Sequence, residues 1–372
     1  MITKTKTTWR KVKLGEIADF AKGKKPQRLT NKKLSENFKE YILLGDEKFY
    51  TEPDRFLVDA MPSDILIVAD GARSGAVLAG KGGVLGSTLL RIRIKNEAQN
   101  KVDSRFLYFG LKHFERVFQS VLTGSAIPHI DQKNLRDFEL LIPEDPVDQK
   151  HIANILSAFD EKIELNNKIN ENLEQMAQAI FKEWFIDSKK LKVKSEKLEE
   201  VAKVIKGKKP QKIYDKPRGG DLEYLLIESL TTNNRFFTDD DKTPKSEEGD
   251  AIVVMDGASS GRIFRGRKGV VGSTLAVVKP RQGISREFLL LLLKRAEPQL
   301  MDNLTGSAIP HLDKDFLKTY PVSVPTPEIM ERFTAFISPM LQKIVGVENE
   351  NQKLSSLRDL LLPKLMSGEI RV

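Results

Sequence analysis

The order of apolar and polar residues predicts strands and helices in two similar stretches of the chain. Residues 64–69 and 251–255 are short apolar runs bounded by turn-forming residues, which is typical of buried strands. Residues 89–94 alternate between apolar and charged side chains, which indicates a strand buried on one face. Residues 104–119 and 285–300 have the spacing of helices. Each stretch is therefore predicted to fold as a mixed α/β (α+β) domain.

A long amphipathic helix is predicted after the first domain. Neither Pro nor Gly occurs in residues 148–186, Pro146 lies just ahead, and Asp148 is suited to cap the helix. At 1.5 Å per residue this helix is roughly 58 Å long. Its apolar residues follow a 3-4 heptad spacing that is interrupted by Asn166 and Asn170. The apolar positions are Ile152, Leu156, Phe159, Ile163, Leu173, Ala177, Ile180 and Trp184.

The last part of the chain predicts a second long helix with the same pattern. Asn351 takes the position that Asn170 has in the first helix. Pro339 and Gly346 weaken this prediction, since both residues disfavour a helix interior. The apolar positions are Phe333, Ile337, Met340, Ile344, Val347, Leu354, Leu361 and Leu365.

Two apolar seams on one chain are most simply buried against each other, as an antiparallel coiled coil. A layer of paired asparagines would fix the register of the two helices at some cost in stability. The alternative is that each helix packs on its own domain. The predicted length of the first helix, far above the average for globular proteins, favours the coiled coil.

The chain contains an internal duplication. Four motifs recur in the same order at offsets of 182 to 186 residues, which chance does not explain. They are LTGSAIPH (122–129 and 304–311), KGKKPQ (22–27 and 206–211), DGARSG (70–75, recurring as DGASSG at 256–261) and GSTL (86–89 and 272–275). One unit of domain and helix is therefore present twice, and two equivalent units pack most simply about a pseudo-twofold axis.

The two repeats differ between the motifs. Residues 28–60 bear little likeness to residues 212–246, as expected if each half binds a different target on a shared framework. The predicted organisation is a first domain (1–147), a first spacer helix (148–187), a second domain (188–326) and a second spacer helix (327–372).

The positive charge of the chain lies in its two domains. The formal net charge is +9. Residues 1–147 carry +6 (25 Lys and Arg against 19 Asp and Glu) and residues 187–326 carry +6 (26 against 20). Residues 148–186 carry −3 (4 against 7), and residues 327–372 are balanced (6 against 6). Two basic domains favour a polyanionic partner, because neutralised phosphates release counterions. A basic protein that binds no nucleic acid is the alternative.

The composition also argues against some classes of protein. The chain has no cysteine, and therefore no disulfide or thiolate metal site. No apolar run approaches the roughly 18 residues of a membrane-spanning helix, and the first residues lack the apolar core of a signal peptide. We therefore expect a cytoplasmic protein.

Motifs for catalysis are scarce. The Asn/Asp-Pro-Pro-aromatic motif with which adenine methyltransferases hold a flipped base is absent, because no Pro-Pro pair occurs, and so is a phosphate-binding G-x-x-x-x-G-K-[ST] loop. Ser125 with His129, and Ser307 with His311, would suit a hydrolase acting on a small substrate. The orienting acid and the oxyanion hole of such an enzyme cannot be identified. Hydrogen bonding within the fold or a DNA phosphate contact is the favoured role of these residues.

Several polar residues of the repeated motifs are candidates for DNA contacts. Lysines in loops bounded by Gly and Pro reach phosphates, glutamines suit adenine edges, and arginines bind guanine or phosphate through two hydrogen bonds. Hydroxyl groups in tight turns also suit phosphate. The candidates are Lys24, Lys25, Gln27, Arg73, Ser74, Ser125, His129, Lys208, Lys209, Gln211, Arg262, Arg265, Arg267, Ser307 and His311, with Lys268 beside them.

These features resemble the specificity subunits of type I restriction-modification systems. The resemblance rests on residues 123–130, their second copy, the two long helices and the ending LLPKLMSGEI at residues 361–370. It covers nearly the whole chain. It implies two target-recognition domains that each contact one half of a bipartite, usually asymmetric DNA target, separated by the spacer helices.

The resemblance further implies that the chain is not an enzyme and binds no cofactor. Its helices would dock two modification subunits that bind S-adenosylmethionine and methylate adenine N6 on opposite strands. Motor-nuclease subunits that use ATP and Mg²⁺ would join in a restricting complex. A free-standing DNA-binding regulator with the same architecture is the alternative.

Overall fold

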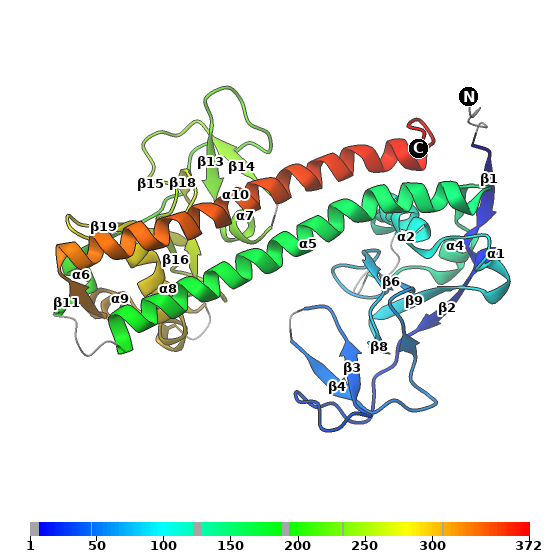
Figure 1. The fold of residues 1–372 in the computed structure, drawn as a ribbon, viewed down its shortest axis with the longest axis horizontal. Helices are drawn as coiled ribbons and strands as arrows, with labels where there is room; N and C mark the ends of the chain where they lie inside the picture. The colour runs from blue at the N-terminus through cyan, green and yellow to red at the C-terminus, as the bar shows by residue number, and fades with distance from the viewer. Residues whose placement is uncertain (1–6, 46, 122–127, 188–192, 233, 307–308) are drawn as a thin grey trace. The chain divides into compact units, whose positions relative to one another are not determined.

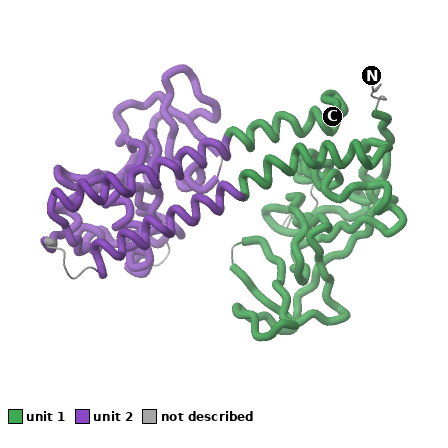
Figure 2. Tube along the Cα trace, viewed as in Figure 1, with its two compact units in different colours: residues 1–164, 353–372 green, residues 165–352 purple. Residues whose placement is uncertain are grey.

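The computed structural model describes residues 7–45, 47–121, 128–187, 193–232, 234–306 and 309–372. The chain forms two compact units (Figure 2). Unit 1 contains residues 1–164 and 353–372, and unit 2 contains residues 165–352. Each unit combines one α/β domain with a segment of each long helix, so both spacer helices contribute to both units (Figure 1).

The domain of unit 1 is built on two four-stranded sheets. The framework sheet has the order β2-β9-β6-β7 and is antiparallel. The second sheet has the order β4-β3-β8-β5, with β3 parallel to β8, and β1 pairs with β10. The strands are β1 (Trp9–Lys13), β2 (Ala18–Lys22), β3 (Lys39–Ile42), β4 (Phe49–Thr51), β5 (Asp59–Ala60), β6 (Ile65–Val68), β7 (Val77–Ala79), β8 (Gly83–Leu85), β9 (Leu89–Ile94) and β10 (Glu139–Pro143). The helices are α1 (Leu14–Ile17), a 3-10 turn (Asn96–Ala98), α2 (Ser104–His113), α3 (Glu115–Ser120) and α4 (Gln132–Asp137).

The domain of unit 2 repeats this topology. Its framework sheet is β12-β19-β16-β17, its second sheet is β14-β13-β18-β15, and β11 pairs with β22. The strands are β11 (Val193–Lys197), β12 (Ala202–Lys206), β13 (Leu222–Leu225), β14 (Phe236–Thr238), β15 (Lys245–Ser246), β16 (Ala251–Val254), β17 (Ile263–Arg265), β18 (Gly269–Val271), β19 (Leu275–Pro280), β20 (Leu304–Thr305), β21 (His311–Leu312) and β22 (Pro321–Pro325). The helices are α6 (Leu198–Val201), α7 (Ile227–Thr231), α8 (Arg286–Asp302) and α9 (Lys314–Thr319). The predicted duplication of a mixed α/β domain is confirmed.

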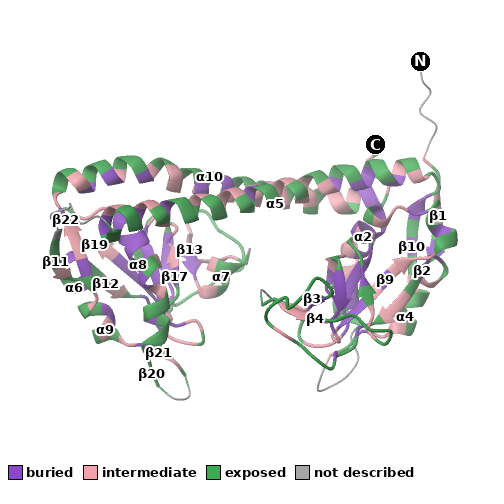
Figure 3. Cartoon of the chain, turned by 60° about the horizontal axis from the view of Figure 1, so that its bottom comes forward, coloured by how far each residue is buried: buried purple, intermediate pink, exposed green. Residues whose placement is uncertain are grey.

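One inner strand of each framework sheet, β6 in unit 1 and β16 in unit 2, is buried on both faces. This burial explains the unbroken apolar run of each strand. In β6, Ile65 and Ile67 belong to the core beneath α2, whereas Leu66 and Val68 belong to the core shared with the second sheet. The side chains of β16 divide in the same way. Successive residues of a strand point to opposite faces, so a strand covered on both sides needs apolar residues throughout. The buried positions gather on these strands and on α2 and α8 (Figure 3).

The first long helix, α5 (Pro146–Lys182), begins two residues before the predicted start and ends in a π-helical turn (Glu183–Asp187). Pro146 lies inside the first turn, where its missing N–H costs nothing. The carboxylate of Asp145 accepts a hydrogen bond from the Val147 N–H at 2.8 Å. Asp145, and not Asp148, therefore caps this helix. The second long helix, α10 (Pro327–Met366), continues through Pro339 and Gly346 without interruption.

The two long helices run antiparallel within each unit. In unit 1, Asp160 of α5 forms an ion pair with Arg358 of α10. In unit 2, Asn166 lies beside Asn351, and the Phe181 ring contacts the Phe333 ring. Higher residue numbers on α5 therefore lie beside lower residue numbers on α10. Both helices also contribute apolar residues to the domain cores. The predicted antiparallel pairing of the two long helices is confirmed. Each helix also packs on the domains, which was the alternative prediction.

The predicted seam positions face inward. Ile152, Leu156, Ile337 and Ile344 are buried, whereas Phe159, Ile163, Asn170, Leu173, Ile180, Leu354, Leu361 and Asn351 are partly buried. A layer of paired asparagines joins the two helices, as predicted. The Asn166 amide donates to Asn351 Oδ1, and the Asn351 amide donates to Asn167 Oδ1, both at 2.8 Å. Asn351 thus pairs with Asn166 and Asn167 and not with Asn170, because the stagger between the helices was not contained in either helix's own pattern.

Gly346 offers a simple test of the second helix. It is exposed, and a Cβ atom placed there meets nothing within 4 Å. We expect Gly346→Ala to raise the free energy of unfolding by about 0.5–1 kcal/mol, because alanine loses less backbone entropy in a helix. Urea titration followed by circular dichroism measures this change. An unchanged or lower midpoint would show that position 346 is not in a regular helix.

Candidate nucleic-acid interface

The four repeated motifs meet at one place in each domain. Main-chain hydrogen bonds join Gly23 to Leu89, Ala69 to Thr88 and Gly71 to Pro128, at 2.9, 2.7 and 3.0 Å. The same bonds join Gly207 to Leu275, Met255 to Thr274 and Gly257 to Pro310, at 2.9, 2.8 and 2.9 Å. The repeated motifs thus form one scaffold at the end of each framework sheet, where β2 and β6 end and β9 begins.

The glycine of each KGKKPQ motif is required by close packing of main chains. A Cβ atom on Gly23 would lie 2.0 Å from the Gly86 carbonyl oxygen, and one on Gly207 would lie 2.2 Å from that of Val271. Both contacts are far below van der Waals distance and involve main-chain atoms that cannot rotate away. The lysine loops that follow are therefore held against the GSTL motifs.

The serine of each DGAxSG turn also belongs to the scaffold. The hydroxyl of Ser74 donates to the carbonyl groups of Pro128 and Ala69, at 2.8 and 3.0 Å. Ser260 makes the corresponding bond to Pro310 at 3.0 Å. Ser74 is buried, so its hydroxyl stabilises the turn and does not face a ligand.

Three motifs contribute one charged or titratable side chain each to what we call the Lys–Asp–His cluster. In unit 2, Asp256 Oδ2 accepts a hydrogen bond from Lys206 Nζ at 2.8 Å. The other carboxylate oxygen, Oδ1, lies 2.8 Å from His311 Nδ1. Partial burial raises the pKa of Asp256, but the hydrogen bonds and charges of Lys206 and His311 outweigh this effect and hold the pKa below its ordinary value. Asp256 is thus a carboxylate at neutral pH.

The corresponding residues of unit 1 are Lys22, Asp70 and His129. Lys22 Nζ lies 2.7 Å from Asp70 Oδ2, and an antiparallel bridge pairs the main chains of Asp70 and His129. The same bridge joins Asp256 and His311. The fold therefore places the three residue types together twice, although they are widely separated in the sequence.

Most of the candidate DNA contacts around the scaffold are exposed. Arg262 lies over the ring of Phe264, with 5.4 Å between its guanidinium carbon and the ring centroid. Ser125 and Ser307 lie outside the described residues. The exposed candidates are Lys24, Lys25, Gln27, Arg73, His129, Lys208, Lys209, Gln211, Arg262 and His311.

Two arginines of the predicted basic cluster are engaged within unit 2. Arg265 forms an ion pair with Glu348 of α10. Arg267 donates to Glu223 Oε1 at 2.6 Å and to the Ser229 carbonyl at 2.7 Å. Both guanidinium groups are thus engaged inside the unit, whereas Lys268 is exposed. The sequence located the cations but not their carboxylate partners.

Two exposed arginines in the divergent segments were not predicted from the sequence. Arg55 lies over the Phe56 ring at 4.7 Å, and Arg218 lies over the Tyr214 ring at 3.9 Å. Phe56 is itself 61% exposed, which is unusual for a large apolar side chain. No repeat marks these residues. The one sequence feature that could have located them is the lack of likeness between residues 28–60 and 212–246.

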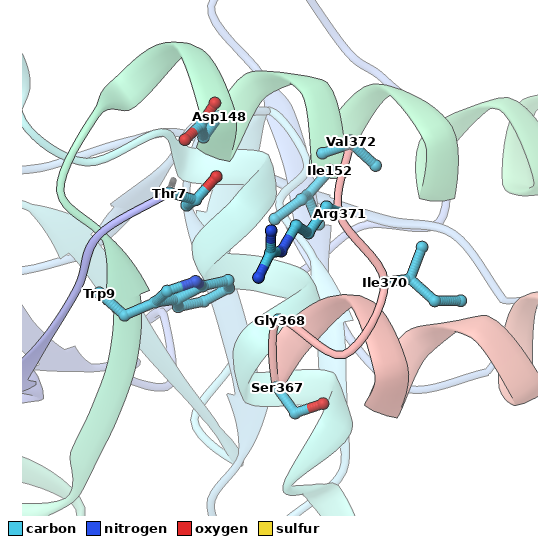
Figure 4. A pocket seen from close by; sticks show the side chains of 9 residues that line it. All are labelled: Thr7, Trp9, Asp148, Ile152, Ser367, Gly368, Ile370, Arg371 and Val372. Atoms are coloured by element: carbon cyan, nitrogen blue, oxygen red, sulfur yellow. The ribbon is translucent and has the colours of Figure 1, made fainter. Parts of the chain in front are cut away.

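Other features of the described residues are less informative. A cavity of about 130 Å³ in unit 1 lies between the first strand and the end of the chain, lined by Trp9, Ile152, Gly368 and Arg371, among others (Figure 4). Within the described residues, no group of three or more His, Asp or Glu side chains is placed to hold a metal ion. None of the described helices is both long and apolar enough to cross a membrane.

Two domains of one topology, each presenting an exposed basic loop beside a shared scaffold, define a DNA-binding protein with two recognition modules. Residues 6–175 and 190–356 each match the family model of the type I restriction modification DNA specificity domain. The chain belongs to this family, as a type I restriction-modification specificity subunit: it determines DNA target recognition and is not itself catalytic.

Named relatives agree with this assignment. The chain is 24% identical to the type I restriction enzyme MjaVIII specificity subunit of Methanocaldococcus jannaschii, over 98% of this chain and 93% of the relative. It is 25% identical to the HindI specificity subunit of Haemophilus influenzae, over 70% and 74% of the two chains. The crystal structure of a type I restriction-modification S subunit from M. genitalium has the same fold, with a TM-score of 0.60 at 20% identity over 98% of both chains.

Proposed function

We propose that this subunit reads a bipartite DNA target, with one half-site bound by each domain. The exposed loops of the shared motifs contact the phosphate backbone, and the divergent segments contact base edges. Phosphate contacts are independent of sequence and suit the shared framework, whereas base contacts must differ between half-sites. The proposed backbone contacts are Lys24, Lys25, Arg73, His129, Lys208, Lys209, Arg262 and His311, with Gln27 and Gln211 placed next to them.

The observation that carries this proposal is the convergence of the repeated motifs. Residues far apart in the sequence build the same exposed basic corner in both domains, whereas the segments beside them have diverged. Ser74, Arg265 and Arg267 are left out of the contact set, because their polar groups are engaged inside the fold. The divergent segments contribute Arg55 and Arg218 as candidates for base contacts.

The chemistry directed by this subunit belongs to its partners. We propose that α5 and α10 dock two modification subunits, which use S-adenosylmethionine to methylate adenine N6 in each half-site. Motor-nuclease subunits that use ATP and Mg²⁺ would join them in a restricting complex in the cytoplasm. Support comes from membership of the family and from relatives named as subunits of restriction enzymes.

Methylation mapping tests this proposal. The chain is expressed with its modification subunit, and N6-methyladenine is mapped across the host DNA by single-molecule sequencing. We expect methylation at one split motif, with one adenine modified in each half on opposite strands. An assembled, active complex that methylates no split motif would contradict the proposal and favour a free-standing DNA-binding regulator.

A further inference from the structure

We propose that the Lys–Asp–His cluster of each domain is a proton-coupled phosphate contact, in which the histidine takes up a proton when DNA binds. The aspartate is its positioning residue. The inference rests on the proposed function and goes beyond it, because it makes the affinity for DNA depend on pH through named residues. The histidine of the cluster is His311 in unit 2 and His129 in unit 1.

Among the residues that the structure describes, only Nδ1 of the His311 ring has a hydrogen-bond partner, which leaves Nε2 for a ligand. Nδ1 lies 2.8 Å from Asp256 Oδ1, so Asp256 accepts a hydrogen bond from this nitrogen and sets the orientation of the ring. Nε2 lies on the opposite side of the imidazole. The side chain is 48% exposed, so a phosphate can approach the ring from solvent. The other oxygen of Asp256 is held by Lys206 Nζ at 2.8 Å.

The charge balance of the cluster explains the coupling to protons. Lys206 and Asp256 cancel, so the cluster is neutral with a neutral imidazole and carries +1 when His311 is protonated. Lys206 comes from β12 and Asp256 from the turn after β16, whereas the neighbouring β20 contributes the uncharged Thr305 and, next to it, Gly306. A phosphate at Nε2 stabilises the protonated ring through a charge-assisted hydrogen bond. DNA binding therefore draws a proton from solvent.

A purely structural role accounts poorly for the cluster. Exposed ion pairs contribute little to stability, with a median of about 0–1 kcal/mol. The scaffold is already held by main-chain hydrogen bonds between the same motifs. Unit 1 nevertheless repeats the arrangement, with Lys22 paired to Asp70 at 2.7 Å and Asp70 bridged to His129. A phosphate contact needed in both half-sites explains why all three residue types are present twice.

The test is the pH dependence of DNA binding by the full chain. The probe is a fluorescein-labelled duplex of random sequence, and Kd is measured by anisotropy between about pH 5.5 and 8.5, where histidine changes charge. The proton is bound more tightly in the complex, so the added affinity is present at low pH and is lost as pH rises. We expect each histidine to contribute a decrease of up to about tenfold per pH unit.

Variants identify the groups responsible. H129Q and H311Q together are expected to flatten the pH profile, so that the variant loses most affinity relative to the unchanged chain at pH 5.5. D70N and D256N should weaken binding at low pH, because the imidazolium loses its positioning carboxylate. The matched control is H151Q, which removes an exposed histidine of α5 and should leave the profile unchanged.

Two results would overturn the inference: a flat profile for the unchanged chain, or a slope that persists in the double histidine variant. Melting curves identify any variant that fails to fold. In that case proton uptake by the unchanged chain, measured calorimetrically in buffers of different ionisation enthalpy, decides the question. Random DNA is used throughout, so failure here is distinct from the absence of a split methylation motif.

Discussion

Replacing Lys24, Lys25, Lys208 and Lys209 together by alanine is expected to weaken binding of random-sequence duplex DNA by about 10²–10³-fold at physiological salt. All four side chains are exposed in loops anchored by Gly23 and Gly207. Each phosphate contact releases counterions, so the slope of log K against log salt should become shallower by about 3 to 4. Anisotropy titrations at several salt concentrations measure both quantities.

The control removes the same charge from the long helices. Lys150, Lys182, Lys343 and Lys353 are exposed on α5 and α10, and their replacement by alanine should change the slope much less. Equal losses in the two variants would mean that only net charge matters. An unchanged slope in the loop variant would remove these lysines from the DNA-binding surface.

Phe333→Ala is expected to lower the free energy of unfolding of unit 2 by about 3–5 kcal/mol. Phe333 of α10 is fully buried, and its ring centroid lies 4.7 Å from that of Phe185 and 5.9 Å from that of Phe181. Trp184 and Phe288 complete the cluster, at 5.7 and 6.4 Å. These rings join α5, α8 and α10, so truncation leaves a cavity where three helices meet. Urea unfolding followed by tryptophan fluorescence measures the loss, since Trp184 lies in the cluster.

Phe336 is the matched control on the same helix. It is 57% exposed, and its replacement by alanine should change stability by less than about 0.5 kcal/mol. Similar effects of the two substitutions would show that the helix does not present its Phe333 face to the domain. A large effect of Phe333→Ala alone supports the packing of the second spacer helix on the domain of unit 2.

The apolar seams of the long helices were predictable from sequence, because a helix places residues three and four apart on one face whatever its partner. Ile152, Leu156, Ile337 and Ile344 are buried, the first three of them in the domain cores. The pairing of Asn351 with Asn166 and Asn167 was not predictable. The stagger of two helices depends on contacts between segments more than 180 residues apart, as the separation of 184 between Asn351 and Asn167 illustrates.

The candidate site shows the same limit. The basic residues of the repeated motifs were visible in the sequence, and most of them are exposed. Arg265 and Arg267 look equally suited to DNA, yet Glu348 and Glu223, which lie 83 and 44 residues away, take up their charges. Residue type predicts what a side chain can bind, whereas its actual partner depends on which distant segments the fold brings near.

By itself, the sequence determined the duplication, the mixed α/β character of each half, the apolar faces of the long helices and the family of the chain. These features are local or repeat along the chain, so spacing and composition record them. Only the tertiary structure decided that the repeated motifs meet at one corner of each domain, and that Lys206, Asp256 and His311 form a cluster. It also decided that Ser74 is buried. These features follow from hydrogen bonds between residues of different motifs, which are 19 positions apart for Ala69 and Thr88 and 50 or more for the members of the cluster. No local pattern encodes such contacts.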